Sequence, residues 1–545
     1  MIFIKDLKLN TLKTMKTLNK SIPRAKSPES VGIDSSVIAK MTEEMSYKGI
    51  NIHSLMILRE NKVACEAWSA PLTPETPHMV YSISKSFLAT AYGFALDEGK
   101  VAKETRLIDV FPELASKKAD SNLKKLTIHH LLCMTAGKQT SIRGNKSDNW
   151  LKSFIDAKWI FEPGTSWRYV NDNYYIASKM LCKLLGESIT EYLTPRLFEP
   201  LGIDTPFWEH APDGTEAGGW GLMLKTEDIA KLILCYQSKG KYNDIQVIPQ
   251  WWTEEATGFI SDNSVSEKEP DASAGYGCGF WRCAGMPNTY RCEGMFCQYA
   301  ISFEDYNACL IMTSEHSDLQ ETLDVIWKYM PEAFIEPTQQ WFENRITLPD
   351  KTQTTVKKRS ETEKNINNKT YAVRKCRFVN AIGFPISSLP MPIVFFAKDR
   401  GGNMNNLKFS FTDEGCEFYW EEDGGFKNSI FLSMNGDASF GEIILGELKM
   451  AVRSYAYWDN DNTLVMHIRP LASVAERVLT FEFKNHKLKM FPRYIPGTDE
   501  KAKKVGDKLK CILIGKWFHW WIDFLVPRVG KILNPTHYGK TKKRY

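Results

Sequence analysis

An almost wholly polar stretch at residues 350–369 (DKTQTTVKKRSETEKNINNK) divides the chain into two parts with different hydrophobic patterns. Before it, strand-like runs occur together with apolar residues at helical spacing. After it, residues 370–492 hold short strand-like runs separated by turns such as Asn435-Gly436. A polar stretch of this length buries little apolar surface and is typical of a linker. Because 545 residues are too many for one compact core, we expect roughly two to four domains.

The first part shows strands, then helices, then strands again. Residues 53–58 and 63–68 predict a β-hairpin, and the apolar spacing after Tyr81 predicts a buried helix that continues roughly to Glu98. Residues 100–270 are mainly helical in pattern. Three strand-like runs and an amphipathic helix follow, in the order YGCGFW, QYAISF, NACLIMTS and LQETLDVIWKYM. This order favours a mixed sheet with a helical insertion.

The charge is unevenly distributed. Residues 501–545 carry twelve Lys or Arg against two Asp, a net charge of +10, so the other 500 residues carry −5 of the chain's +5. A mildly acidic bulk gives no sign of nucleic-acid binding. The twelve cysteines show no regular spacing, and the first 20 residues lack the apolar core of a signal peptide. We therefore expect reduced thiols and a cytoplasmic protein.

Residues 508–545 combine aromatic and basic side chains, including Trp517, Trp520 and Trp521. One interpretation is an interfacial helix on an anionic membrane, which makes peripheral membrane contact a candidate property. The other is a terminal helix packed on the β domain with a basic end. No uninterrupted apolar run reaches the roughly 18 residues of a transmembrane helix.

Ser82-Ile83-Ser84-Lys85 places a hydroxyl and an amine one helical turn apart, a pair that can build an acyl-transfer site without histidine. The same pattern recurs from Ser121 to Lys124 and from Ser238 to Lys241. Those two copies lie in a highly charged run and at the end of an amphipathic helix, where surface lysines are common. Only Ser82 stands at the head of an apolar helix, so it is the predicted nucleophile.

A Ser-Lys nucleophile needs a second group that handles protons. Tyr169-Val170-Asn171 offers one, and the preceding turn signal Glu162-Pro163-Gly164-Thr165 would place it on a loop at a cleft. Tyr-x-Asn is a common tripeptide, so packing roles for its tyrosine and asparagine stay equally open.

These motifs, together with HLLCMTAG, EPGTSWRYVN, EPLGI and GGWGLMLKTEDIAKL, resemble the serine β-lactamase-related family of class C β-lactamases and penicillin-binding-protein-like esterases. The resemblance covers roughly residues 25–335 in uninterrupted order. It implies that Ser82 is acylated, that Lys85 helps remove its proton, that Tyr169 is a shared base and acid, and that Asn171 orients the substrate or the lysine. The backbone amide of Ser82 would then form half of an oxyanion hole.

The third motif of this family departs from its usual pattern. The corresponding stretch is Arg291 to Gln298 (RCEGMFCQ), which keeps Gly294 and Gln298 as substrate-binding candidates but has no Lys or His at its central positions. A cation there would help bind an acidic substrate's carboxylate, so its loss argues against β-lactam hydrolysis. A backbone amide near Cys297 or Gln298 would still complete the oxyanion hole.

Other chemistries lack their motifs. The chain has no Gly-x-Ser-x-Gly elbow, no His-Glu-x-x-His and no Cys-x-x-Cys pair. Cys278, Cys283, Cys292 and Cys297 are expected to be small buried side chains, and the pair His129-His130 is expected to pack a helix. We therefore expect neither a metal nor a cofactor.

The resulting hypothesis is an α+β fold, with a β-lactamase-like antiparallel sheet, flanking helices and a helical insertion, followed by a separate all-β barrel that resembles a lipocalin. The predicted function is hydrolysis of a small-molecule ester, amide or small peptide through an acyl-enzyme on Ser82. The alternative is a catalytically inactive binding scaffold, suggested by the altered third motif. The expected domains are an N-terminal extension (1–24), the hydrolase domain (25–340), a linker (341–369), the barrel (370–495) and a basic aromatic tail (496–545).

Overall fold

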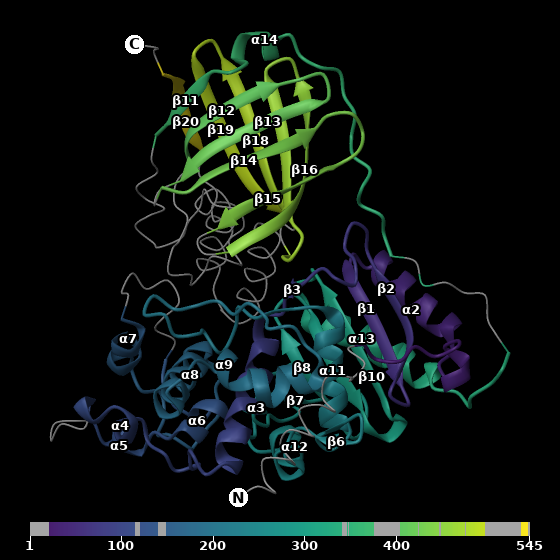
Figure 1. The fold of residues 1–545 in the computed structure, drawn as a ribbon, viewed down its shortest axis with the longest axis vertical. Coiled ribbons are helices and arrows are strands. Elements are labelled where there is room, and N and C mark those ends of the chain that lie inside the picture. The colour runs from purple at the N-terminus through teal and green to yellow at the C-terminus, as the bar shows by residue number, and fades with distance from the viewer. Residues whose placement is uncertain are drawn as a thin grey trace, which may run out of the picture. The chain divides into compact units, whose positions relative to one another are not determined.

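The computed structural model describes two compact units, the first ending at Pro349 and the second beginning at Asp350 (Figure 1). The residues that the structure describes are 21–114, 120–139, 149–340, 346, 348–374, 404–422, 425–445, 448–474, 476–495 and 536–542.

The first unit contains an antiparallel sheet that confirms the predicted hairpin and the later strands QYAISF and NACLIMTS. Its strand order is β2-β1-β10-β9-β8-β7. The strands are β1 (Ile52–Arg59), β2 (Lys62–Trp68), β7 (Trp281–Arg282), β8 (Thr289–Gly294), β9 (Gln298–Phe303) and β10 (Ala308–Ser314). Short pairs form β3 (His78–Met79) with β4 (Met223–Leu224) and β5 (Lys241–Tyr242) with β6 (Ile245–Gln246).

Helices cover both faces of this sheet because its strands are apolar on both sides. On one face, α2 (Ser35–Tyr47) and the predicted closing helix α13 (Leu319–Ala333) pack together over a core that includes Leu55, Ile301 and Leu310. On the other, α11 (Thr226–Gln237) contacts β1, β9 and β10. Residues 276–280 of the expected strand YGCGFW are irregular, and only Trp281 belongs to β7.

The helical insertion lies between β2 and β7 in the chain and includes α3 (Ser84–Asp97) (Figure 1). Every residue of α3 from Ser84 to Ala95 is buried, as its apolar pattern predicts. A short 3₁₀ turn, η2 (Tyr81–Ile83), precedes α3 and carries Ser82. The other elements are α4 (Leu107–Val110), α5 (Ser121–Lys125), α6 (Ile128–Leu132), α7 (Trp150–Asp156), α8 (Asn171–Leu185), α9 (Ile189–Leu193), α10 (Glu199–Leu201) and α12 (Gln250–Thr257).

The second unit is the predicted all-β domain. Its strand order is β14-β13-β12-β11-β20-β19-β18-β17-β16-β15, and a further pairing of β14 with β16 closes the sheet into a barrel. The strands are β11 (Thr370–Val373), β12 (Met404–Phe411), β13 (Gly415–Glu422), β14 (Lys427–Ser433), β15 (Ser439–Leu445), β16 (Leu448–Asn460), β17 (Thr463–Pro470), β18 (Glu476–Lys484), β19 (Lys487–Ile495) and β20 (His537–Thr541).

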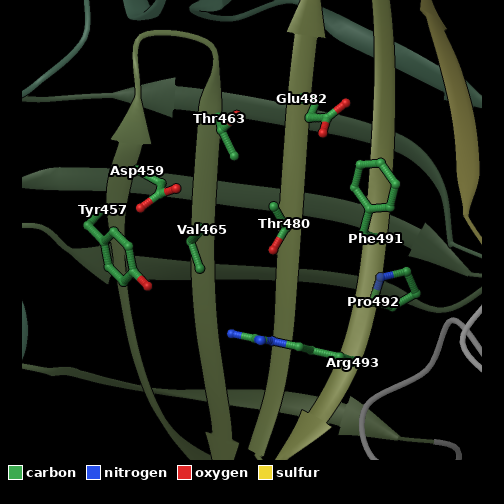
Figure 2. A pocket seen from close by; sticks show the side chains of 9 residues that line it. All are labelled: Tyr457, Asp459, Thr463, Val465, Thr480, Glu482, Phe491, Pro492 and Arg493. Carbon is green, nitrogen blue, oxygen red and sulfur yellow. The ribbon is translucent and has the colours of Figure 1, made fainter. Parts of the chain in front are cut away.

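Aromatic side chains fill the barrel interior. Phe409 contacts the rings of Tyr371, Phe418, Phe481 and Phe483. The pocket in Figure 2, of about 440 Å³, is lined by Thr463, Val465, Thr480 and Glu482 among others. Because these residues alternate along β17 and β18 with the fully buried Leu464, Met466 and Phe481, the pocket lies on the outer face of the barrel.

The polar stretch at residues 350–369 is part of the second unit rather than a free connector. The backbone amide of Thr354 donates to Gly436 O, and that of Ala438 donates to Thr352 O. The stretch also forms a short helix, α14 (Thr362–Ile366), where Ile366 is buried. Its polar side chains are partly satisfied by the barrel, since Trp458 Nε1 donates to Glu363 Oε1 at 2.6 Å.

Two sequence predictions fall on residues outside the described ranges, namely the N-terminal extension up to residue 20 and the aromatic segment around Trp517. Membrane contact through residues 508–545 therefore stays a prediction. Of the helices that the structure describes, none has both the length and the apolarity needed to cross a bilayer.

Candidate active site

Ser82 lies in a turn whose backbone is tightly held. Tyr81 has a φ of 50°, a left-handed conformation that costs energy for a tyrosine, and its ring makes an edge contact with Phe296 at 5.3 Å. Ser84 Oγ donates to Tyr81 O at 2.6 Å and accepts from the amide of Leu222 at 3.2 Å. The turn therefore presents Ser82, which is partly exposed, directly before the buried helix α3.

The Lys85 amine is surrounded by three oxygen atoms. Its Nζ lies 2.9 Å from Ser82 Oγ, 2.8 Å from Asn171 Oδ1 and 2.6 Å from Gly219 O. The side chain is only 1% exposed, and among the described residues no carboxylate forms an ion pair with it. Burial lowers the pKa of Lys85 well below its ordinary value. In this geometry Nζ donates to all three oxygens, and a neutral amine would keep its bonds to Asn171 and Gly219 while its lone pair faced the Ser82 hydroxyl.

Tyr169 completes the arrangement from a loop, as its sequence context predicts. Its ring stacks on Trp281 at 5.4 Å, and the Lys85 amine lies 5.0 Å from the ring centre. Burial raises the pKa of Tyr169 above its ordinary value, although a hydrogen bond with Ser82 opposes that effect. The phenol is therefore protonated at neutral pH, and the structure brings together Ser82, Lys85, Tyr169 and Asn171.

The segment HLLCMTAG holds the loop of Tyr169 through hydrogen bonds to Met134. Met134 Sδ accepts hydrogen bonds from the amide of Val170 at 3.4 Å and from Asn173 Nδ2 at 3.6 Å. Its carbonyl accepts from the amide of Arg168 at 2.9 Å. Both neighbours of Tyr169 are thus tied to Met134, a positioning residue that the analysis of single motifs missed.

The third motif forms a tight turn between β8 and β9, with Gly294 paired to Gln298. A Cβ at Gly294 would lie 2.3 Å from Val80 O, so only glycine allows the turn to approach the backbone before Ser82. Phe296 and Cys297 both have positive φ, at 67° and 62°. This close approach is compatible with the prediction that a backbone amide of the turn donates a hydrogen bond to the oxyanion.

The Gln298 side chain has a different setting from the predicted substrate contact. It is fully buried, and its Nε2 donates to the carbonyl groups of Met295, Phe296 and Ser314 at 2.7–3.1 Å. Its Oε1 accepts from the amide of Ser314 at 3.2 Å. These contacts fit a residue that holds the shape of the turn better than one that binds substrate.

The one basic residue of the third motif is engaged inside the protein. Arg291 is 1% exposed, and its Nε donates to Glu293 Oε2 at 2.7 Å. Its other nitrogens donate to the backbone carbonyl groups of Arg282 and Asp271. Within residues 291–298, therefore, no free cation is available to a substrate carboxylate.

Gly219 is a second residue of the site that the sequence motifs did not single out. Its carbonyl accepts from Lys85, and a Cβ there would lie 2.9 Å from Tyr174 Cβ and 3.4 Å from Lys85 Nζ. The segment GGWGLMLK contributed to the resemblance. The role of its second glycine depends on the backbone carbonyl, and every residue has one, so the residue type does not reveal that role.

Comparisons with known proteins find similarity to the first unit of the chain. A family model described as Beta-lactamase matches residues 37–332. The chain is 26% identical over 186 residues to a beta-lactamase of Escherichia coli (strain K12), covering 33% of this chain and 48% of that protein. It is 30% identical over 128 residues to penicillin-binding protein 4 of Amycolatopsis lactamdurans, covering 22% and 33%. The chain thus spans half or less of the length of these relatives.

Solved structures with a similar fold include two that align along nearly their whole length. A D-amino acid amidase from Ochrobactrum anthropi SV3, complexed with L-phenylalanine, has a TM-score of 0.44 and 16% identity, covering 55% of this chain and 98% of that chain. A penicillin-binding protein from Bacillus halodurans has a TM-score of 0.42 and 16% identity, covering 53% and 99%. Since the family model spans more than half of the residues, the chain belongs to the Beta-lactamase family.

Proposed function

We propose that this protein is a serine hydrolase that forms an acyl-enzyme at Ser82 and releases it with water. The observation that carries this proposal is the environment of Lys85, a buried amine that contacts the Ser82 hydroxyl and has no carboxylate partner among the described residues. A lysine in such a place serves as a base because its charged form has lost hydration.

Acylation starts when Lys85 Nζ takes the proton of Ser82. Ser82 Oγ bonds to the substrate carbonyl carbon, and the carbonyl π electrons move to the oxygen. Backbone amides are suited to stabilise this oxyanion, and the candidates are the amide of Ser82 and an amide of the turn after Gly294. Neither amide depends on the identity of the side chain, so the altered third motif is compatible with this step.

Collapse of the intermediate requires a proton for the leaving group. The Tyr169 phenol is protonated and hydrogen-bonded to Ser82, so it donates to the leaving oxygen or nitrogen as the carbonyl re-forms. The proton held by Lys85 then restores the phenol. Water attacks the acyl-enzyme by the reverse pathway, with the same two groups handling its proton.

The substrate class follows from the charges around the turn. Because Arg291 is neutralised by Glu293, the motif gives no cation to a substrate carboxylate. This arrangement favours neutral esters, amides or small peptides over acidic β-lactams. The intact contacts of Lys85 with Ser82, Asn171 and Gly219 also support catalysis over a binding scaffold, which needs no neutral amine beside a serine.

The test is to trap the acyl-enzyme. The full-length protein is incubated with a p-nitrophenyl ester and quenched in acid, and the adduct is located by peptide mass spectrometry. We expect one acyl group on Ser82. We also expect the rate of turnover to be highest for esters, lower for D-peptides and lowest for β-lactams. An unmodified Ser82 and no turnover across the panel would overturn the proposal.

A further inference from the structure

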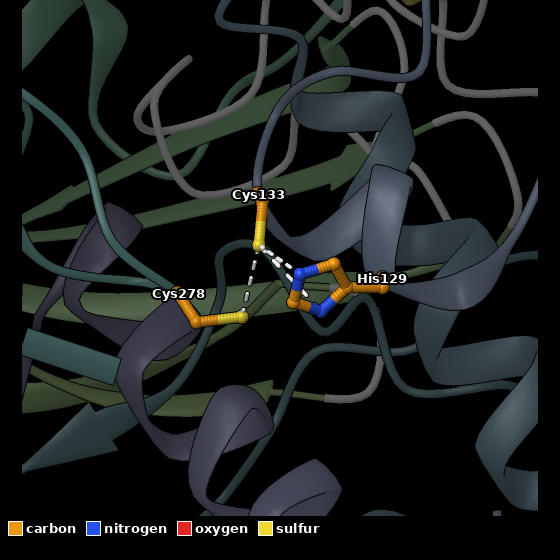
Figure 3. Close-up of side chains that lie close together, drawn as sticks. All are labelled: His129, Cys133 and Cys278. Carbon is orange, nitrogen blue, oxygen red and sulfur yellow. Dashed lines mark hydrogen bonds between the residues drawn. The ribbon is translucent and has the colours of Figure 1, made fainter. Parts of the chain in front are cut away.

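Three potential metal ligands lie together outside the proposed catalytic residues: His129, Cys133 and Cys278 (Figure 3). Cys133 Sγ is 3.5 Å from Cys278 Sγ, 3.5 Å from His129 Nε2 and 3.8 Å from His129 Nδ1. One donor atom from each residue falls within 4.8 Å of the other two.

The backbone fixes all three side chains. His129 and Cys133 are four residues apart at the end of α6, which places them on one helical face, and the amide of Cys133 donates to His129 O at 2.9 Å. Cys278 comes from a separate segment, held by a hydrogen bond from its amide to Ala256 O at 2.8 Å. The preceding residue has to be glycine, because a Cβ at Gly277 would lie only 2.1 Å from the same carbonyl oxygen.

Two of the three separations between donor atoms match the edges of a tetrahedral site. With Zn–S bonds of about 2.3 Å and Zn–N bonds of about 2.0–2.1 Å, a tetrahedron has S···S edges of about 3.8 Å and S···N edges of about 3.6 Å. The observed 3.5 Å separations differ from these values by a few tenths of an ångström. The third separation, between His129 and Cys278, is within 4.8 Å, and a small rotation of the partly exposed imidazole would bring it to the length of a tetrahedral edge.

The surroundings suit a shielded site with an entry path. Cys133 and Cys278 are at most 1% exposed, whereas His129 is partly exposed and would admit the ion. The ring of Tyr92 lies 6.4 Å from that of His129, and its buried hydroxyl has no hydrogen-bond partner among the described residues. A water molecule in the fourth coordination position would give such a hydroxyl a partner.

We propose that His129, Cys133 and Cys278 bind a thiophilic divalent cation of the zinc type. The ion would join two segments that support the catalytic residues. Cys133 precedes Met134, which holds the Tyr169 loop, and Cys278 precedes Gly279, whose carbonyl accepts from Ser86 Oγ on α3 at 2.7 Å. None of the three ligands is among the groups that contact Ser82, so the ion would act on the packing around the catalytic residues.

The sequence concealed this site, since 145 residues separate Cys133 from Cys278. The expectation that His129 only packs a helix, and that Cys278 is only a small buried side chain, rested on the lack of local ligand spacing.

The experiment uses the full-length protein, reduced and treated with a chelator under nitrogen. It is titrated with Co²⁺ as a spectroscopic probe and then with Zn²⁺, and bound metal is counted by elemental mass spectrometry. We expect one ion per chain, thiolate-to-cobalt charge transfer with tetrahedral visible bands, and a higher melting temperature with Zn²⁺.

Cys278→Ser should weaken Zn²⁺ binding by at least about 100-fold, because loss of a direct ligand costs no less than loss of an outer partner. Cys235→Ser, a change at another fully buried cysteine on α11, is the matched control and should bind like the wild type. His129→Gln tests the partly exposed ligand should Cys278→Ser fail to fold, and circular dichroism of each variant checks the fold.

Three results would overturn the proposal. One is the absence of stoichiometric binding in the reduced wild type, and another is equal affinity in Cys278→Ser and Cys235→Ser. The third is a Cys133–Cys278 disulfide found by peptide mapping together with no metal binding after reduction, which would assign the pair to redox chemistry.

Discussion

Two copies of Ser-x-x-Lys in one unit differ in almost everything except their sequence pattern. Lys85 lies on α3, where each residue from Ser84 to Ala95 is buried, while Lys124 lies on α5, where only Leu123 is. Ser121 and Lys124 are both exposed, and Lys124 stands in the last turn of its helix, a favourable place for a positive charge. The comparison shows that packing around the lysine, rather than the tetrad, lowers the pKa of Lys85, which is the property that a base needs.

The largest expected effect separates the two serines. Ser82→Ala should abolish labelling by a fluorophosphonate probe and lower kcat/KM for a p-nitrophenyl ester by at least about 10³-fold, because the nucleophile is lost. Ser121→Ala should change neither. If Ser82→Ala were still labelled, the nucleophile would be another residue, and the contrast between Ser82 and Ser121 would fail.

The second-largest effect is expected from substitution of the two lysines. Lys85→Met should lower kcat by about 10²- to 10⁴-fold through loss of the base, while Lys124→Met leaves it unchanged. Steady-state kinetics measure both. Equal rates in the two variants would mean that another group removes the Ser82 proton.

The pH profile sharpens the same contrast. Because burial lowers the pKa of Lys85, its amine is neutral, and active, above that lowered pKa and becomes protonated as the pH falls through it. We expect kcat/KM to rise with pH along an acid limb set by Lys85 and to keep that limb in Lys124→Met. An acid limb that persists in the residual activity of Lys85→Met would assign it to a different group.

Tyr169→Phe should lower kcat by about 10²-fold with little change in KM, since the phenol acts in proton transfer to the leaving group. Esters with good leaving groups should lose less activity than amides, because they need less protonation. Tyr419→Phe, in the barrel, is the control. A change confined to KM would indicate a binding role for Tyr169.

The smallest expected effect concerns the turn before β9. Gly294→Ala places a Cβ 2.3 Å from Val80 O and should cost about 1–3 kcal/mol of stability, with a modest loss of kcat as the turn shifts away from Ser82. Gly441→Ala, on β15, would meet its first neighbour only at 4.0 Å and should be neutral in both respects. The measurements are the melting temperature and kcat of the two variants. Equal values in both would mean that the turn after Gly294 does not contribute to the site.

Much of the site was accessible to sequence reasoning because its residues belong to local patterns. Ser82 and Lys85 share a helical turn, and Tyr169 and Asn171 follow a recognisable turn signal, so proximity within each motif needs no fold. Gly219 and Gln298 were not interpretable in this way. The first acts through its carbonyl and the second through contacts with Ser314 across two strands, and neither property is a feature of side-chain type.

The sequence by itself determined the order of elements, the family resemblance and the choice of Ser82, because hydrophobic periodicity and local motifs are read along the chain. Only the tertiary structure decided that Lys85 is stripped of water beside three oxygens, that residues 350–369 lie against the barrel and that Cys278 meets His129 and Cys133. The physical reason is the same in each case. Desolvation, hydrogen-bond partnership and ligand geometry depend on atoms brought together from distant segments, and they exist only once the chain has folded.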